Sequence, residues 1–282
     1  MCGIGGIYVF DNQYVSPYVL QELIIALLDL LEERGRDATG IAIYYNDATM
    51  YIRKAPIRAE RFIELLPFSR LKLDRAKIVL LHCRAATQGD PEDNENNHPL
   101  YAFAWKRRRV VSVVHNGVIR TYGSSWVTDF VEREVDSDML LAGVRRWGEL
   151  TVKVINDTID EVYGSMACLW TDGSVLVSYR YNNPLYIWWL FHNNDPKMVV
   201  YASTEEILAT ALSCAGIGFG KGDIVEVAEN RILVHTANGG ILSVEGPKNY
   251  VVHTYGYYYN RRDKYKNSYF NHNGYFGWDP YD

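Results

Sequence analysis

The sequence predicts an α+β protein in which two sheets stack between layers of helices. Stretches rich in Ile, Val and Tyr recur from residue 3 to residue 236, as is typical of buried strands. Amphipathic segments interrupt them at several points, and turn residues separate one strand from the next. No internal repeat is visible, and 282 residues suffice for one large domain or two small ones.

The first half of the chain is expected to alternate between strands and helices. Ser16 and Pro17 open an amphipathic helix that should end near Gly35, because serine caps helices and proline suits the first turn. Strands are expected at 3–10, 40–45, 49–53, 77–82 and 110–115, and a short helix at 59–66. The strand at 110–115 runs into Asn116-Gly117, a dipeptide that predicts a sharp turn.

The second half is expected to be richer in strands. Helices at 136–147 and 151–160 come first, with Asp136 or Ser137 near the cap of the former. A further helix should begin after Ser203. Strands are expected at 165–171, 174–180, 185–191 and 198–202, followed by a hairpin formed by 223–228 and 231–236. Asp172-Gly173 predicts the turn between the first two of these strands.

Composition narrows the class of protein. A net charge of −5 argues against a nucleic-acid-binding protein. Cys83, Cys168 and Cys214 lie among apolar or small residues and are expected to be inert core cysteines. The N-terminus lacks the pattern of a secretory signal, and no apolar run approaches the ~20 residues of a membrane span. We therefore expect a cytoplasmic protein, and nothing in the sequence indicates a metal or organic cofactor.

Cys2 is the first candidate functional residue. If Met1 is removed, this residue carries both a thiol and a free α-amine, with reference pKa values of about 8.5 and about 7.7–8.0. The amine can then serve as the base that activates the thiol. The alternative is an ordinary first strand that happens to follow Met-Cys.

The chain changes character from Tyr250 onward, where Tyr, Asn, Gly and Arg crowd together without a strand or helix period. The stretch is either an irregular tail or an aromatic docking segment for a partner or a second copy of the chain. Stacking on single-stranded nucleic acid is a third interpretation with no support elsewhere in the sequence.

Several polar stretches follow one another along the chain: Cys2-Gly3-Ile4, Arg-Gly-x-Asp-x-x-Gly at 34–40, Arg-x-Ala-Thr-x-Gly at 84–89, Asn-x-His-Pro at 96–99, Val-Val-His-Asn-Gly-Val-Ile at 113–119, Ser137-Asp138, and further stretches at 164–167, 183–186 and 202–205. In this order they resemble the motifs of the class-II glutamine amidotransferase domain, which has an N-terminal nucleophile (Ntn). The glutaminase domains of glucosamine-6-phosphate synthase and of glutamine phosphoribosylpyrophosphate amidotransferase look most similar.

The resemblance implies a four-layer αββα sandwich, the Ntn hydrolase fold, and hydrolysis of the side-chain amide of glutamine. Cys2 would attack the amide carbon and form a thioester. Asn116, through its side-chain amide, and Gly117, through its backbone N–H, would stabilise the oxyanion. Glycine suits position 117 because its backbone should approach the substrate closely.

The resemblance also implies residues for the charged end of glutamine. Arg84 would bind the α-carboxylate, since a guanidinium matches a carboxylate in two places. Asp138 would bind the α-ammonium group, and Thr87 and Gln88 would line the carboxylate end. His98, His115 and Arg34 would support the site through hydrogen bonds. Together with Cys2, Asn116 and Gly117 and the four residues for the charged end, they make up the predicted site.

Three departures from the family pattern concern the surroundings of the site. Ala85 replaces a bulky aromatic residue, Gln88 replaces the usual histidine, and Met139-Leu140 follow Ser137-Asp138 in place of Thr or Ser and then Glu. They leave the glutaminase chemistry intact and bear on loop closure and ammonia channelling.

The expected organisation is a glutaminase domain at 1–245 and a docking tail at 246–282. The tail after residue 245 is too short for an ammonia-using synthase, and no phosphate-binding loop appears, which argues against ATP use. The first hypothesis is therefore a stand-alone glutaminase that passes ammonia to a separate synthase. The second is an amidohydrolase for another γ-glutamyl amide, and the third is a non-catalytic binding or structural protein that retains Met1. The sequence leaves a homo-oligomer open.

Overall fold

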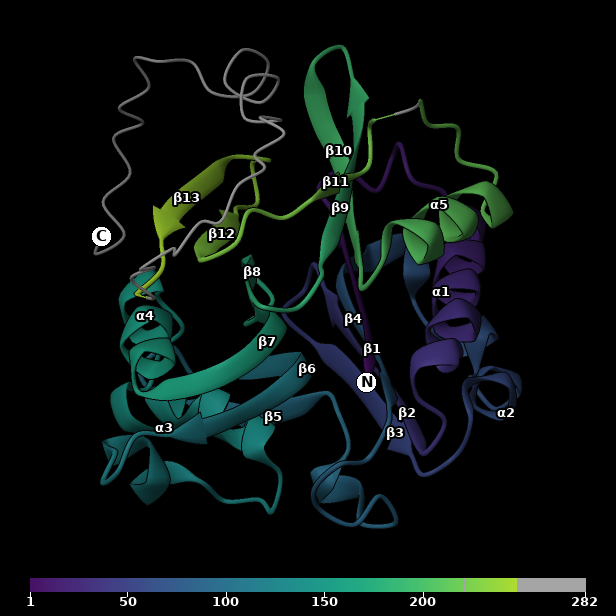
Figure 1. The fold of residues 1–282 in the computed structure, drawn as a ribbon. Helices are drawn as coiled ribbons and strands as arrows, with labels where there is room; N and C mark the ends of the chain where they lie inside the picture. Colours follow the sequence, from purple (N-terminus) through teal and green to yellow (C-terminus); the bar gives the residue numbers. More distant parts are fainter. Residues whose placement is uncertain (221, 248–282) are drawn as a thin grey trace, which may run out of the picture. The chain divides into compact units, whose positions relative to one another are not determined.

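A computed structural model describes residues 1–220 and 222–247 (Figure 1). Met1–Pro247 form one compact unit. The tyrosine-rich stretch from Tyr250 onward lies outside the described residues, so the expectations for a docking tail stay predictions. None of the helices in the described part of the chain is long and apolar enough to cross a membrane.

Two antiparallel sheets form the centre of this unit. The first has the strand order β11-β9-β10-β1-β4-β2-β3 and the second the order β13-β12-β8-β7-β6-β5. The strands of the first sheet are β1 (Gly3–Val9), β2 (Ala38–Tyr45), β3 (Met50–Ala55), β4 (Ala76–Arg84), β9 (Tyr186–His192), β10 (Asp195–Ala202) and β11 (Val225–Glu226). Those of the second are β5 (Leu100–Ala104), β6 (Arg109–Thr121), β7 (Val162–Thr171), β8 (Leu176–Tyr181), β12 (Arg231–His235) and β13 (Ile241–Glu245).

Helices cover the outer face of each sheet (Figure 1). The first sheet carries α1 (Pro17–Leu31), α2 (Ala59–Glu64) and α5 (Glu205–Cys214), and the second carries α3 (Ala142–Trp147) and α4 (Val152–Asp160). The expected helix start is confirmed, because the Ser16 side chain accepts a hydrogen bond from the Val19 backbone N–H. The layers therefore run helix, sheet, sheet, helix, and the predicted four-layer αββα sandwich is confirmed.

The strand β1 shows why the two sheets stack. Ile7 and Val9 pack against the helices α1 and α5, whereas Ile4 and Tyr8 point into the space between the sheets. Successive side chains of a strand alternate between faces, so a strand that is apolar at nearly every position needs cover on both sides. A layer on each face of β1 supplies that cover.

The prediction of a turn at Asn116-Gly117 is wrong. The strand β6 continues through both residues and pairs with β7, with Asn116 opposite Ala167 and Gly117 opposite Met166. Gly117 has φ +148°, and a Cβ there would lie 1.9 Å from the carbonyl oxygen of Ser165. The glycine is thus required by the close approach of β7, which is a different reason from the substrate approach that we expected.

The predicted final hairpin is also wrong. Val225–Glu226 pairs with β9 in the first sheet, whereas Arg231–His235 pairs with β8 and β13 in the second. The segment between them passes from one sheet to the other. The helix expected at 136–147 begins as a 3₁₀ helix over Asp136–Leu141 before α3, and Cys214 is exposed, unlike the expected core cysteine.

Candidate active site

Cys2 lies at the entrance of β1, in the middle of the first sheet. Its thiol donates to the carbonyl oxygen of Ala85 at 3.6 Å, and its own carbonyl accepts a hydrogen bond from Arg34 Nε at 3.0 Å. Burial raises the pKa of the Cys2 thiol, while the positive charges of Arg84 and of the chain's amino group oppose the rise. Arg34 thus holds the backbone of Cys2.

The loop that carries Arg34 is fastened to the end of β4. Asp37 accepts a hydrogen bond from the Ala86 N–H at 2.7 Å, and its own N–H donates to the Arg84 carbonyl at 2.9 Å. A Cβ at Gly35 would lie 2.3 Å from the backbone carbon of Arg84, so only glycine permits this approach. The motifs at 34–40 and 84–89 therefore form one structural unit beside Cys2.

Arg84 is 3% exposed, and its guanidinium organises the loop that follows. Nη2 donates to the carbonyl oxygens of Gln88 at 2.5 Å and Gly89 at 2.8 Å, and Nη1 donates to Asn97 Oδ1 at 2.7 Å. A guanidinium has five donors, so these bonds occupy much of its capacity. Binding of a substrate carboxylate by Arg84 would require some of these loop contacts to be exchanged.

Asn116 is the most unusual polar residue of the site. It is 1% exposed, yet neither Oδ1 nor Nδ2 has a hydrogen-bond partner among the described residues. Its backbone carbonyl accepts a hydrogen bond from Asn183 Nδ2 at 2.8 Å, which fixes the backbone and leaves the amide available. A buried unpaired amide costs about 1–3 kcal/mol, and such groups are expected where a ligand will supply the partner.

Three histidines lie close together beside Asn116. His98 stacks on His82 with ring centroids 4.2 Å apart, and His82 Nε2 lies 3.1 Å from the carbonyl oxygen of His115. Burial lowers the pKa of all three, that of His82 to about 3. They are therefore neutral near pH 7 and are suited to hydrogen bonding. Sequence reasoning missed His82, although a histidine at the end of a buried strand just before Arg84 was a usable signal.

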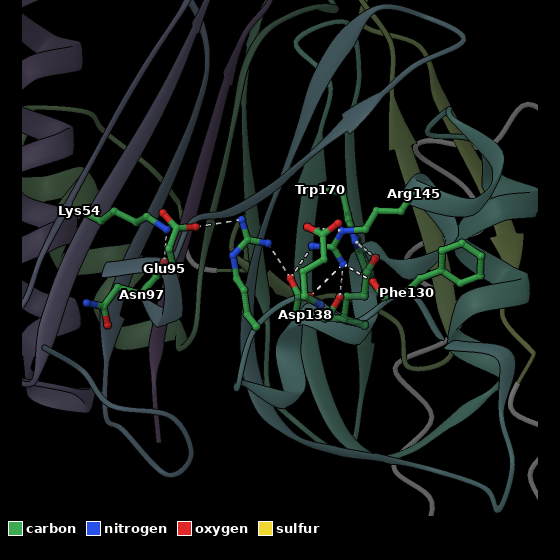
Figure 2. A network of polar contacts seen from close by, with 10 residues as sticks. Lys54, Glu95, Asn97, Phe130, Asp138, Arg145 and Trp170 are labelled. Carbon is green, nitrogen blue, oxygen red and sulfur yellow. Dashed lines mark hydrogen bonds and ion pairs between the residues drawn. The ribbon is translucent and has the colours of Figure 1, made fainter. Parts of the chain in front are cut away.

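Asp138 is fully buried among arginines (Figure 2). Its Oδ1 accepts from Arg133 Nη1 at 2.8 Å and from Arg145 Nη2 at 2.7 Å, and its Oδ2 accepts from the Glu132 N–H at 2.7 Å. Burial alone would raise the pKa of Asp138, but the bonds and charges of these arginines bring it below its ordinary value. Both oxygens are taken, which argues against the prediction that Asp138 binds the substrate ammonium group.

The same network reaches the loop after Arg84. Arg133 also pairs with Glu95 at 3.3 Å, and Lys54 Nζ donates to the Asn97 carbonyl at 2.9 Å (Figure 2). Asp138 thus lies at the centre of a charged network that ties the 87–97 loop to α3.

Asp136 is the carboxylate that faces a pocket. The pocket has a volume of about 580 Å³ and is lined by Thr87, Gln88, Val118, Ile119, Arg120, Thr121, Asp136, Met139 and Tyr163. Cys2 is not part of this lining, but the negative charge of Asp136 acts on the Cys2 thiol and raises its pKa. Sequence reasoning treated Asp136 only as a helix cap. Among the described residues, no group of three or more His, Cys, Asp or Glu side chains is arranged to hold a metal ion.

The chain resembles known proteins in sequence and in fold. No protein-family model matches the chain. The glutamine–fructose-6-phosphate aminotransferase (isomerizing) of Aeropyrum pernix is 27% identical over 249 residues, which are 87% of this chain and 36% of that protein. The enzyme of the same name from Chlorobaculum tepidum is 24% identical over 254 residues, 90% of this chain and 37% of that protein. The chain spans about a third of the length of these relatives.

Two solved structures share the fold. The glutamine phosphoribosylpyrophosphate amidotransferase from B. subtilis, complexed with ADP and GMP, superposes with a TM-score of 0.58 at 20% identity. A structure described as the allosteric regulatory enzyme of purine biosynthesis superposes with a TM-score of 0.62 at 19% identity. In each case the match covers 88% of this chain and 50% of the other.

The two layered sheets with helices on their outer faces are the Ntn-type fold shared with type 2 glutamine amidotransferases. The resemblance to the class-II glutamine amidotransferase domain is thereby confirmed, and the particular relatives are the glutamine–fructose-6-phosphate aminotransferases in sequence and the phosphoribosylpyrophosphate amidotransferase in structure.

Proposed function

We propose that this chain is a glutaminase subunit that hydrolyses the side-chain amide of glutamine and passes the ammonia to a separate acceptor enzyme. The buried amide of Asn116, unpaired among the described residues, carries the proposal, since it matches an oxyanion donor that waits for its ligand. In this proposal residues 1–245 are the glutaminase domain, and residues 246–282 are a docking segment for the acceptor.

The reaction begins once Met1 has been removed from Cys2. Removal of the initiator methionine requires a small second residue, and Cys2 meets that requirement. The α-amine of Cys2 accepts the thiol proton, and the sulfur attacks the amide carbon of glutamine. Asn116 Nδ2 and the Gly117 N–H stabilise the oxyanion. The ammonium form of the amine then returns the proton to the leaving nitrogen, and ammonia departs from the thioester.

Water completes the cycle. The free amine of Cys2 accepts a proton from water as its oxygen attacks the thioester carbon, and the same oxyanion donors act again. Collapse releases glutamate and returns the proton to sulfur. Arg34 acts from outside the reacting atoms by holding the Cys2 carbonyl.

The head group of glutamine is held at the pocket. Asp136 takes the place that we predicted for Asp138, because it lines the pocket while Asp138 is committed to arginines. Arg84 binds the α-carboxylate after exchanging loop carbonyls for it, and Thr87 and Gln88 form the adjoining wall. His98 and His115 remain supporting residues.

The test combines mass spectrometry with a glutaminase assay. Intact mass should show loss of Met1, and the processed protein should release glutamate from glutamine. Cys2→Ala should abolish release, whereas Cys214→Ala should not, because Cys214 is an exposed cysteine at the end of α5. A processed wild-type protein that is inactive with and without candidate acceptor enzymes would refute the proposal, and a retained Met1 would support the non-catalytic alternative.

The size of the pocket favours a second candidate. A volume of about 580 Å³ extends past Asp136 to Arg120 and Tyr163, which leaves room for a group larger than glutamine. The second candidate is therefore a γ-glutamyl amide that is larger than glutamine. Comparing kcat/KM for glutamine and γ-glutamylglycine separates the two candidates, since a preference for the latter would replace the first proposal.

A further inference from the structure

A chain of hydrogen bonds through three buried side chains, here called the relay, ends at the Asp136 carboxylate that faces the pocket. His115 Nδ1 lies 2.7 Å from Ser137 Oγ, and Ser137 Oγ donates to Asp136 Oδ1 at 3.3 Å. Asp136 Oδ2 accepts a second hydrogen bond, from the Ile119 N–H at 2.8 Å. The exposed fractions of His115, Ser137 and Asp136 are 1%, 4% and 9%, so water competes little for these bonds.

The direction of the relay follows from the number of protons. An ionised carboxylate only accepts, so the single hydroxyl proton of Ser137 points to Asp136. The same oxygen must then accept from His115, which requires the proton of the neutral imidazole to be on Nδ1. Nε2 of His115 then bears a lone pair. The Ser165 backbone lies close enough to His115 to raise its pKa, but Nε2 makes no hydrogen bond of acceptable geometry within residues 1–220 and 222–247.

Two strands fix the far end of the relay. His115 is held in β6 opposite Cys168 of β7, and its carbonyl oxygen lies 3.1 Å from His82 Nε2 in β4. His82 is in turn opposite Ile4, two residues after Cys2. The relay therefore ties the orientation of Asp136 to the strand that carries the nucleophile candidate, across both sheets.

We propose that His115 and Ser137 are positioning residues that orient the Asp136 carboxylate toward the α-ammonium group of the substrate. The proposal rests on the glutaminase function proposed above. With one hydrogen bond fixed on each oxygen, the remaining lone pairs of Asp136 point in a set direction, and a substrate ammonium can meet them without reorienting the carboxylate.

The test compares glutamine with glutaramate, which is glutamine without its α-amino group. Ser137→Ala should lower kcat/KM for glutamine about tenfold, equivalent to about 1.4 kcal/mol, mainly through KM. The value for glutaramate should stay unchanged, so the preference for glutamine falls by the same factor. Ser137→Thr should restore it, because threonine keeps the hydroxyl. Ser178→Ala is the matched control, a buried serine whose hydroxyl donates to Tyr201 at 3.1 Å.

Equal losses for both substrates in Ser137→Ala would overturn the proposal, because a general loss of structure predicts that result. Nitrogen NMR of the folded wild-type protein tests the relay independently, since His115 should carry its proton on Nδ1, and a proton on Nε2 would overturn it.

Should the wild-type protein hydrolyse neither substrate, the proposed function fails separately. Calorimetric binding of both ligands to Cys2→Ala, with and without Ser137→Ala, then decides the positioning role, and an unchanged preference for glutamine would overturn it.

Discussion

The Arg145 guanidinium hydrogen-bonds both oxygens of the Asp138 carboxylate. It donates from Nη2 to Oδ1 at 2.7 Å and from Nη1 to Oδ2 at 2.9 Å. The pair is buried, with side-chain exposures of 9% for Arg145 and 0% for Asp138. A bidentate pair of this kind fixes the relative positions of its two segments. It holds the 3₁₀ helix that carries Asp136 against α3. Because Asp136 lines the pocket, the pair also helps to fix the position of that carboxylate.

Asp138→Asn is expected to destabilise the protein by about 3–5 kcal/mol, because it leaves buried arginine charge without its partner. Denaturant unfolding measures the change. Asp157→Asn is the matched control, since Asp157 pairs with Lys153 on the surface at 2.6 Å and should contribute about 0.3–0.5 kcal/mol. Equal losses in the two variants would contradict a central role for Asp138.

Asn116→Ala should separate activity from stability. The glutaminase kcat should fall about 10²–10³-fold if the amide donates to the oxyanion. The unfolding free energy should fall less than is usual for a buried polar residue, because no side-chain hydrogen bond is lost within the part of the chain that the structure describes. A large loss of stability with little change in kcat would assign Asn116 a purely structural role.

Gly117→Ala is expected to be strongly destabilising. The added Cβ would lie 1.9 Å from the Ser165 carbonyl oxygen, and φ is +148°. Gly216→Ala provides a control for the conformational part, since Gly216 has φ +70° and a Cβ added there would meet no atom within 4 Å beyond its chain neighbours. Backbone strain alone costs about 1–3 kcal/mol, so Gly117→Ala should exceed the control in thermal unfolding. Equal shifts in Tm for the two variants would show that β7 moves to accommodate the added Cβ at little cost in stability.

Buried His235 should make stability depend on pH. Burial lowers the pKa of His235 to about 3, below the ordinary value of about 6.5. Between these values the unfolded chain binds a proton that the folded chain does not, so stability falls as the pH drops from about 6.5 towards 3.

His235→Gln should reduce that dependence by about 1.4 kcal/mol per pH unit, the contribution of one proton. Glutamine can still offer a hydrogen-bond partner to the Tyr201 hydroxyl, which bonds His235 Nε2. Unfolding free energies at pH 7 and pH 5 measure the slope. An unchanged slope would mean that His235 is charged in the folded state or that other groups dominate this range.

Local signals in the sequence predicted most elements correctly. The start of α1 follows from the capping of Val19 by Ser16, and the turn at Asp172-Gly173 follows from its short-range geometry. The order of motifs also led to Cys2, Arg34 and Arg84, which lie at strand ends or between elements, and to Asn116, which lies within β6. These features depend on neighbours in the chain or on a pattern of residue types, and both can be recognised in the amino-acid sequence.

The sequence by itself determined the layered fold and the motifs of the site. Only the tertiary structure decided how Asn116-Gly117 and Asp136-Ser137-Asp138 are used. Asn116-Gly117 is strand because β7 approaches so closely that a side chain at 117 has no room. Two carboxylates separated by one residue have similar local surroundings, and Asp138 becomes a structural anchor because Arg133 and Arg145 converge on it. Asp136 is left facing the pocket, since the partners of a side chain depend on contacts that the local sequence does not specify.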